Sequence, residues 1–488
     1  MRSVDIAVSS VLQPTPIGVH TTCGPILGTR GGDVTAKRYS RRQAIGLGAG
    51  TFAALYLAAC GGGGGTSGGA SGEPTATTSV DVLYDWTYNG PPGKVAEFWR
   101  QARAKLAQTN GNARIGQLTE VPFESLYQTV PAAIQAKSGP SIATWYADYA
   151  TFRLSSAGDI APVSDLVAAS EPPHWLLAST VNNGKYYGAP MVLEIAVLVI
   201  NRKLFDKAGI SLETQFASYA AFTDACDRLK SAGITPIQAG TSDGVGAEKW
   251  AQFEQLQVCE TPADLLRGVI GEVSVDAPVF ARPRDQIPVL RDKYMNPKVH
   301  QDTDQMSIDK FLGGSAGMAI AYTSQVLGAK TTPEFEVIGF PKAAAKFNRP
   351  AIGTGDPLIV MDYADTKAAA AEVIQFLHEP EQLNLWWSLT GSFPGDDRFD
   401  ASQLPAQGKR IWDFAVAQPG DPYSLWWPDN YYPPSVALPY IGIEQDQFAG
   451  ASTPAQARDK TDQLFKQFRD GSPQEVEVVK EYIAVLPQ

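Results

Sequence analysis

Aromatic and acidic side chains stand together in two short segments of the chain. Trp86 and Tyr88 directly follow one β-rich run, and Trp145 and Asp148 lie at the end of another. Flat aromatic rings can stack on the apolar faces of a sugar ring, and a carboxylate can accept hydrogen bonds from its hydroxyl groups. A hydrogen bond to a charged group contributes about 1.5–3 kcal/mol, against about 1 kcal/mol for a neutral one. These four side chains are therefore candidates for binding a neutral polar ligand.

Two further carboxylates stand in unusual surroundings. Glu194 is the one charged residue in the apolar run 191–198. A carboxylate without a partner is costly to bury, so Glu194 needs either a ligand or a structural salt bridge. Asp356 follows a Gly-Thr-Gly sequence, and backbone amides near glycine can approach a ligand closely. We take both acids as candidate ligand-binding residues.

Several of these candidates have an ordinary structural alternative. Trp86 and Trp145 could pack in a core, and Asp148 could cap the N-terminus of a helix. Trp250 follows a predicted strand by one loop. For Trp250 the sequence leaves core packing and ligand binding equally open.

The elements that must position these residues alternate between strand and helix at the start of the body. Strands are predicted at 80–84, 113–118 and 141–146, with helices at 94–109 and 124–137 between them. This order is typical of a parallel α/β sheet. Ligands bind such sheets beyond the carboxyl ends of the strands, which is where the two aromatic segments begin.

A second set of elements follows along the chain. Strands are predicted at 196–200, 234–238, 318–322 and 337–340, and helices at 204–209, 216–231 and 366–378 and from Pro454 onward. A chain of 488 residues is too long for one simple core. We therefore expect an α/β protein with two lobes.

The first 59 residues have the pattern of an export signal. Basic residues at 37–42 precede an uncharged stretch that ends in Leu-Ala-Ala before Cys60. This ending resembles the bacterial lipobox, which implies a diacylglyceryl group on the thiol of Cys60, and the Ser-Arg-Arg at 40–42 resembles a twin-arginine signal. The alternative is an uncleaved N-terminal anchor helix. Residues 60–77 are rich in Gly and Ser and predict a flexible tether.

Charge and cysteine content exclude several partners. The first 59 residues carry six of the 40 basic and two of the 51 acidic side chains, so residues 60–488 keep 34 and 49, a net charge of −15. Such a surface repels phosphate backbones, and we expect no nucleic-acid partner. Cys226 and Cys259 are either two buried thiols or a disulfide, which an extracytoplasmic setting permits. The sequence has no C-x-x-C pattern, and we expect no metal and no cofactor.

A series of short segments resembles a known family. Residues 184–190 (GKYYGAP), 197–201 (VLVIN) and 204–210 (LFDKAGI) match its motifs in order. Further matches follow at 222–236, 311–318, 340–341, 367–380, 391–394 and the helix that starts at 453. Together they resemble, over about 78–475, the extracellular solute-binding proteins of family 1, the maltose-binding-protein-like receptors of ABC importers.

The resemblance implies a two-lobed, periplasmic-binding-protein-like α/β fold of type II, with a ligand cleft between the lobes. Three crossover segments would join the lobes, near 191–196, 352–358 and 427–435. Lobe 1 would comprise 78–193 and 354–430, and lobe 2 would comprise 194–353 and 431–488.

The resemblance also implies roles in ligand binding for particular residues. Trp86, Trp145 and Glu194 match positions that face the ligand in the family. Tyr322 stands where the family commonly has a Gly-x-Trp sequence. The third crossover supplies three more candidates: Trp426, Trp427 and Asp429. Because 396–440 departs from the family pattern, we expect the middle of the site to be specialised.

We therefore expect a lipid-anchored substrate-binding protein of an ABC importer, which captures a sugar or oligosaccharide by hinge closure. It would be a monomer, exported to the outer face of the cytoplasmic membrane, with the importer's transmembrane subunits as its partners. One alternative is another polar solute such as a polyamine. An alternative of another class is a secreted carbohydrate-active hydrolase, with Glu194 and Asp148 as its two carboxylates.

Overall fold

The computed structural model describes residues 77–85, 93–122, 125–176, 180–211, 218–259, 261–327, 335–338, 340–341, 352–416 and 428–486. The predicted export signal, Cys60 and almost all of the predicted tether lie outside these residues. No helix in the described part of the chain is long and apolar enough to cross a membrane.

The first sheet has the strand order β2-β1-β3-β13-β4, and β7 also pairs with β13. Its strands are β1 (Thr78–Asp85), β2 (Ala113–Val121), β3 (Ile142–Thr144), β4 (Ile160–Ala161), β7 (Ala189–Pro190) and β13 (Pro357–Met361). β1 pairs in parallel with β2 and β3, which confirms the predicted parallel arrangement of these three strands. β13 runs antiparallel to β3, β4 and β7.

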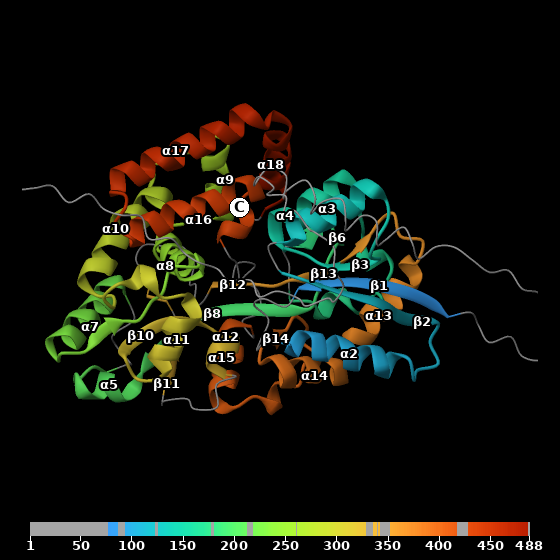
Figure 1. Cartoon of the computed structure of the whole chain (residues 1–488), viewed down its shortest axis with the longest axis horizontal. Coiled ribbons are helices and arrows are strands. Elements are labelled where there is room, and N and C mark those ends of the chain that lie inside the picture. Colours follow the sequence, from blue (N-terminus) through green and yellow to red (C-terminus); the bar gives the residue numbers. More distant parts are fainter. Residues whose placement is uncertain are drawn as a thin grey trace, which may run out of the picture. The chain divides into compact units, whose positions relative to one another are not determined.

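Alternate side chains of β1 face two different hydrophobic cores. Val80, Val82 and Tyr84 pack with α2 (Lys94–Leu106), α13 (Lys367–Leu377) and α14 (Pro380–Thr390). Leu83 packs instead with α3 (Leu126–Ala136) and α4 (Asp148–Ala157). Figure 1 shows these two groups of helices on opposite faces of the sheet. A strand that is covered on both faces is buried along most of its length, as the apolar run at 80–84 indicates.

The second sheet is built around the long strand β8 (Val192–Asn201). Its order is β11-β8-β10-β9, and β12 and β14 also pair with β8. The other strands are β9 (Thr235–Ile237), β10 (Ala316–Tyr322), β11 (Phe335–Ile338), β12 (Ile352–Thr354) and β14 (Phe393–Pro394). β8 runs antiparallel to each of its four partners, and β10 and β9 are parallel.

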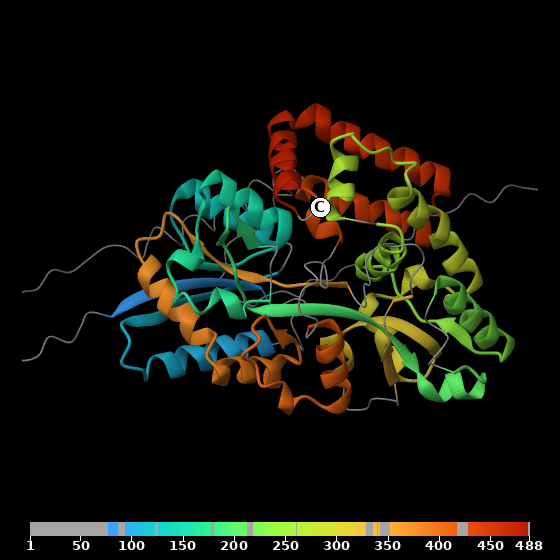
Figure 2. The same cartoon turned by 180° about the vertical axis from the view of Figure 1, so that it is seen from behind.

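Helices cover both faces of the second sheet because β8 is apolar on both sides. Ala196, Leu198 and Ile200 pack with α7 (Tyr219–Ser231) and α8 (Val245–Leu256), whereas Val197 and Val199 pack with α11 (Asp304–Leu312) and α15 (Ala406–Ala415). The remaining helices here are α5 (Arg202–Lys207), α9 (Pro262–Val269), α10 (Pro278–Lys293), α12 (Thr323–Leu327), α16 (Pro434–Phe448), α17 (Pro454–Gly471) and α18 (Pro473–Val485). Figure 2 shows α16, α17 and α18 grouped beside α9 and α10.

The chain passes between the two sheets at two of the predicted crossovers. β7 belongs to the first sheet and β8 to the second, so the first crossing lies at Met191. The return lies at 355–356, between β12 and β13. Most of the third predicted crossover lies outside the described residues. α15 packs with the second sheet, although we expected 354–430 to belong to lobe 1, and the exact lobe boundaries stay a prediction.

The two cysteines of the body are free thiols and do not form a disulfide. Cys226 and Cys259 are both buried in the core that contains α7 and α8. Burial raises the pKa of the Cys226 thiol. Of the two interpretations that the sequence left open, the structure therefore supports the pair of buried thiols.

Candidate ligand-binding site

The structure places six of the predicted site residues: Trp145, Asp148, Glu194, Trp250, Tyr322 and Asp356. Trp86, Tyr88, Trp426, Trp427 and the side chain of Asp429 lie outside the described part, so their predicted roles stay predictions.

Two of the candidates, Trp145 and Asp356, come from one edge of the first sheet, where Asp85 also lies. β1 ends at Asp85 and Trp145 follows the last residue of β3, while Asp356 precedes the first residue of the antiparallel β13. The backbone N–H of Trp145 donates to the carbonyl oxygen of Pro357 at 2.9 Å. The N–H of Met191, at the first crossover, donates to the carbonyl of Asp356 at 3.2 Å. The carboxyl edge of the first sheet is thereby joined to the segment that leads into the second.

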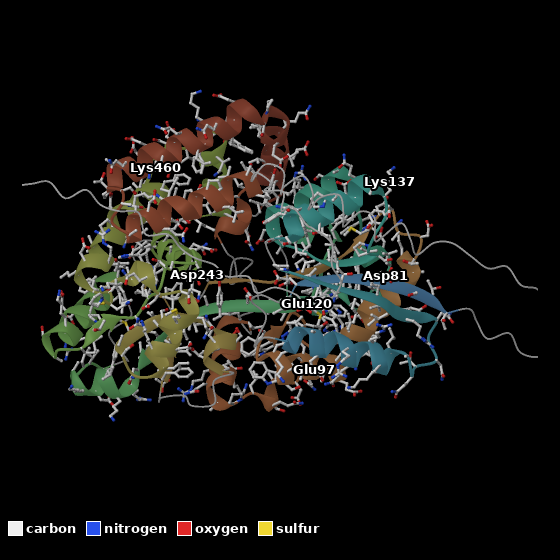
Figure 3. The ribbon with its side chains drawn as sticks, in the orientation of Figure 1. Asp81, Glu97, Glu120, Lys137, Asp243 and Lys460 are labelled. Atoms are coloured by element: carbon white, nitrogen blue, oxygen red, sulfur yellow. The ribbon has the colours of Figure 1, made fainter. Side chains whose placement is uncertain are left out.

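A group of four acidic side chains lies where this edge faces the second sheet. We call Asp85, Glu194, Glu248 and Asp356 the carboxylate cluster. Asp85 and Asp356 are 1 % and 6 % exposed, and they also line one small internal cavity. Glu194 projects from β8 at the position that pairs with Thr354 of β12. Figure 3 labels two further acids of these elements, Glu120 on β2 and Asp243 in the loop before α8.

The electrostatics of the carboxylate cluster favour a protonated Glu194. Burial raises the pKa of the Glu194 carboxyl well above its usual value, and the charges of Asp356 and Asp85 raise it further. Lys249 opposes this rise. The side chain keeps some contact with solvent, yet it is deep enough for loss of hydration to be the main cause. A protonated carboxyl can donate a hydrogen bond as well as accept one, which suits a sugar hydroxyl group.

Helix α8 supplies one member of the cluster, Glu248, and the neighbouring Lys249, neither of which the sequence revealed. Glu248 accepts a hydrogen bond from the Gln252 amide at 3.0 Å. Lys249 is fully buried, and its Nζ lies 2.7 Å from Oδ2 of Asp304. The same Nζ lies 3.7 Å from the centre of the Tyr322 ring. Tyr322 thus lies beside the cluster, and its ring contacts a buried cation.

The backbone of α8 packs closely against the loop that precedes it. A Cβ atom on Gly246 would lie 1.9 Å from the carbonyl oxygen of Gly240, so a larger residue cannot occupy this position without movement. Trp250, the next aromatic residue of α8, is 1 % exposed and its ring lies 5.4 Å from that of Phe253. In this structure Trp250 is a core residue, so of core packing and ligand binding the structure supports core packing.

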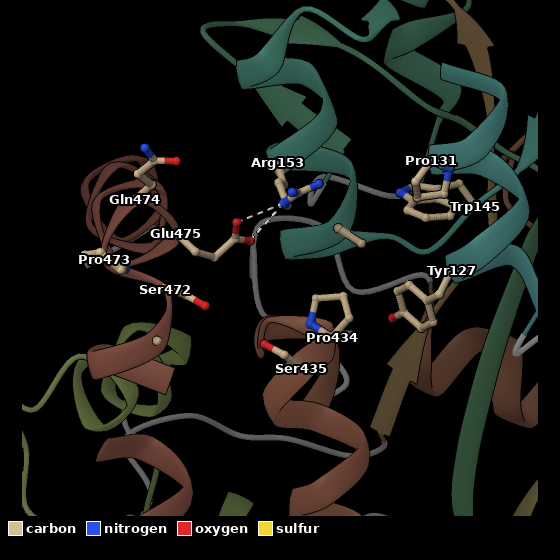
Figure 4. A pocket seen from close by; sticks show the side chains of 12 residues that line it. Tyr127, Pro131, Trp145, Arg153, Pro434, Ser435, Ser472, Pro473, Gln474 and Glu475 are labelled. Carbon is tan, nitrogen blue, oxygen red and sulfur yellow. Dashed lines mark hydrogen bonds and ion pairs between the residues drawn. The ribbon is translucent and has the colours of Figure 1, made fainter. Parts of the chain in front are cut away.

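An open pocket, which we call the Trp145 pocket, has a volume of about 590 Å³. Its lining residues are Tyr127, Pro131, Trp145, Ala150, Arg153, Pro434, Ser435, Gly471, Ser472, Pro473, Gln474 and Glu475. Figure 4 shows that Tyr127 and Trp145 lie on one side and Pro473 and Gln474 on the other. The volume is within the range of about 300–1,000 Å³ that small-molecule sites occupy.

Aromatic rings form the first-sheet side of the Trp145 pocket. Tyr127 stacks on Tyr146 with ring centres 3.9 Å apart, and Trp145 meets the Tyr127 ring edge-on at 5.7 Å. Trp145 is 3 % exposed, and its indole N–H has no hydrogen-bond partner within the described residues. A buried donor without a partner is costly, so a ligand acceptor at this place would gain binding energy.

Asp148 begins α4 in a strained conformation. Its φ of 57° lies in the left-handed region, which costs a residue with a side chain about 1–2 kcal/mol. It is the first residue of the helix and Ala147 is the cap, so the alternative of an Asp148 N-cap is wrong. Asp148 is 2 % exposed, and its charge contributes to the raised pKa of Tyr482, whose main cause is burial. Strain of this kind is concentrated at functional sites.

The acidic residues do not form a metal site. Among the described residues, no group of three or more His, Cys, Asp or Glu side chains is arranged to hold a metal ion. The arrangement offers hydrogen-bond acceptors, a carboxyl whose pKa is raised by burial, and flat rings. These are the groups that recognise a polar, uncharged molecule with apolar faces.

Comparison with known proteins identifies a family. Residues 117–383 match the model of the family described as bacterial extracellular solute-binding protein. No curated protein matches the chain.

Solved structures show the same fold at low identity. A chitin oligosaccharide binding protein is 18 % identical with a TM-score of 0.68, covering 80 % of this chain and 98 % of its own. The cyclic α-maltosyl-1,6-maltose binding protein of Arthrobacter globiformis is 19 % identical with a TM-score of 0.58, covering 83 % and 100 %. The GacH receptor of Streptomyces glaucescens, solved with acarbose, is 17 % identical with a TM-score of 0.59, covering 83 % and 100 %. These likenesses confirm the predicted two-lobed α/β fold.

Proposed function

Because the chain belongs to the bacterial extracellular solute-binding proteins, we propose that it binds a sugar or short oligosaccharide at the carboxyl edge of its first sheet. The observation that carries this proposal is the position of Trp145. Its ring lines the open pocket, and its backbone N–H is bonded to the residue that follows Asp356 of the carboxylate cluster. Rings for the sugar faces and acids for the hydroxyl groups thus come from one edge.

The three solved structures named above support a saccharide as the ligand class. These proteins are described as binding a chitin oligosaccharide, cyclic α-maltosyl-1,6-maltose and acarbose. Proteins of this family work with ABC transporters, and we extend this partnership to the present chain. Export, and a lipid on Cys60 that holds the protein at the membrane, belong to the same proposal. A mass spectrum of the mature N-terminus would detect the diacylglyceryl group.

A polyamine is a second candidate because of the carboxylate cluster. A cationic ligand would offset the mutual repulsion of Asp85, Glu194 and Asp356 and would lower the pKa of Glu194. Its binding would therefore release protons, whereas a neutral sugar adds no charge. Isothermal titration in two buffers of different ionisation enthalpy separates these ligands. A hydrolase would show turnover of oligosaccharides, and we propose that this chain shows none.

The test of saccharide binding is a thermal-shift screen of the purified full-length chain with mono- and oligosaccharides. A ligand at 100 times its Kd stabilises the folded state by about 2.7 kcal/mol. We expect a shift with at least one saccharide, which Trp145→Phe and Glu194→Gln weaken. The control is Trp412→Phe, because Trp412 is similarly buried at 7 % exposure but packs on Phe393 and Phe399. A panel without any shift would refute the proposal.

A further inference from the structure

The C-terminal helix α18 lies against α4, the helix that begins at the strained Asp148. The ring of Tyr482 lies 5.6 Å from that of Tyr149 and 4.7 Å from that of Phe152. Tyr482 is 2 % exposed and Tyr149 is fully buried. Figure 1 shows α18 beside α4. An aromatic contact of this size fixes the position of α18 relative to the first sheet.

Polar contacts hold the first turn of α18 to the same helix. Oε1 of Glu475 accepts hydrogen bonds from the Tyr149 hydroxyl at 2.8 Å and from Nε of Arg153 at 2.9 Å. Its Oε2 lies 3.1 Å from the same Nε. Figure 4 shows this pair between the two sides of the Trp145 pocket. Because its oxygens are engaged by α4, Glu475 acts as an attachment for the helix.

The start of α18 forms a wall of the pocket. Five of the twelve lining residues are the consecutive residues 471–475, at the junction of α17 and α18. They stand opposite Trp145 and Tyr127, and the partly exposed Tyr127 ring offers a surface on which a sugar would stack. The side chains of Ser472 and Gln474 make no hydrogen bond within the described residues, so they can meet a ligand hydroxyl group.

We propose that the junction 471–475 is the end wall of the saccharide site and limits the length of the saccharide that the protein accepts. The inference rests on the proposed function. A sugar stacked at Tyr127 extends along the pocket until it meets this wall, and the contacts of Glu475 and Tyr482 with α4 hold the wall in place. Gln474 is the residue that sets the limit, because it lines the pocket and is itself exposed.

The test measures affinity against chain length by isothermal titration of the full-length chain. The probes are malto-, xylo- and chito-oligosaccharides of one to six sugar units, titrated into wild type, Gln474→Trp and Glu477→Trp. Glu477 is the matched control, because it is exposed on the same helix but does not line the pocket. Gln474→Trp should weaken the longest accepted saccharide by about tenfold or more and leave the shortest unchanged, because added bulk meets a filled pocket. Glu477→Trp should leave the whole profile unchanged.

A chain that ends at Ser472 and lacks α18 provides the converse test. It should bind saccharides longer than wild type accepts, with an affinity about tenfold higher than wild type has for them. If this variant does not fold, the length profile of Gln474→Trp alone tests the proposed end wall. Equal length profiles in wild type and Gln474→Trp would overturn the end wall while leaving the proposed function intact. Failure of every variant and of wild type to bind any saccharide would overturn both.

Discussion

Removing the Glu475 carboxylate should loosen α18 by an amount that the contacts allow us to estimate. The ion pair with Arg153 is partly exposed, with side-chain exposures of 44 % and 21 %, and such pairs contribute about 0.2–1 kcal/mol. The bond from the buried Tyr149 hydroxyl to a charged acceptor contributes about 1.5–3 kcal/mol. Glu475→Ala loses both, so local opening of α18 should become easier by about 2–4 kcal/mol.

Native-state hydrogen exchange measures this opening directly. A change of about 2–4 kcal/mol corresponds to exchange of the α18 amides that is about 30- to 850-fold faster. Glu475→Gln keeps an acceptor for Tyr149 but loses the charge, so its exchange should rise by less than that of Glu475→Ala.

The matched control for this measurement is Glu477→Ala. Glu477 pairs with Lys480 on the exposed face of the same helix, at 2.7 Å. Such a pair contributes about 0.2–0.5 kcal/mol, so exchange should change by less than about threefold. The reasoning fails if Glu475→Ala leaves α18 as protected as in wild type, or if the two alanine variants behave alike.

Two further predictions concern the carboxylate cluster and the packing of α8 against the loop that precedes it. The raised pKa of Glu194 means that the folded chain holds its proton more tightly than the unfolded chain, so this contribution to stability is present at acidic pH and is lost as the pH rises. Glu194→Gln should therefore melt at the same temperature as wild type near pH 4 and above it at pH 8 by calorimetry; a gain at pH 4 alone would contradict this sign. Gly246→Ala should destabilise the fold by about 1–3 kcal/mol in urea unfolding, because its Cβ meets a carbonyl oxygen. Gly442→Ala, within α16 and with nothing inside 4 Å of the new atom, should instead stabilise by about 0.5–1 kcal/mol, and equal effects would refute the packing argument.

Local sequence patterns predicted the helices and strands whose apolar residues are regularly spaced or form a continuous run. The helix expected at 94–109 is α2, and its face of Val95, Phe98 and Trp99 is buried as the 3.6-residue period requires. The strand expected at 196–200 is the centre of β8. For α2 the period fixes which side chains are covered, whereas the continuous apolar run of β8 is covered on both faces.

The position of α8 could not be predicted, because its burial is not a local property. Every residue from Gly246 to Leu256 is buried, including Glu248 and Lys249. A polar residue inside a helix normally indicates a solvent face, and the partners of Lys249, Asp304 and the Tyr322 ring, are more than fifty residues away in sequence. Only the tertiary fold brings these groups together.

The role of α18 in the pocket could not be predicted from the sequence, for a related reason. The family resemblance extends only to about residue 475, and the start of α18 acquires its role through contacts with Tyr149 and Arg153. Asp148 and Trp145 were found because they follow a predicted strand, which the fold brings to the expected sheet edge. Glu194 was predicted as a site residue because a single carboxylate in an apolar run is costly to bury without a partner or a ligand.

A crystal structure of the full-length chain with a saccharide chosen from the thermal-shift screen tests the central claim most directly. We expect a sugar ring stacked on Tyr127 beside Trp145 in the pocket, with a hydroxyl group within about 3.2 Å of Asp85, Glu194 or Asp356. A saccharide bound at a different place, with the Trp145 pocket and the carboxylate cluster both free of it, would contradict the account.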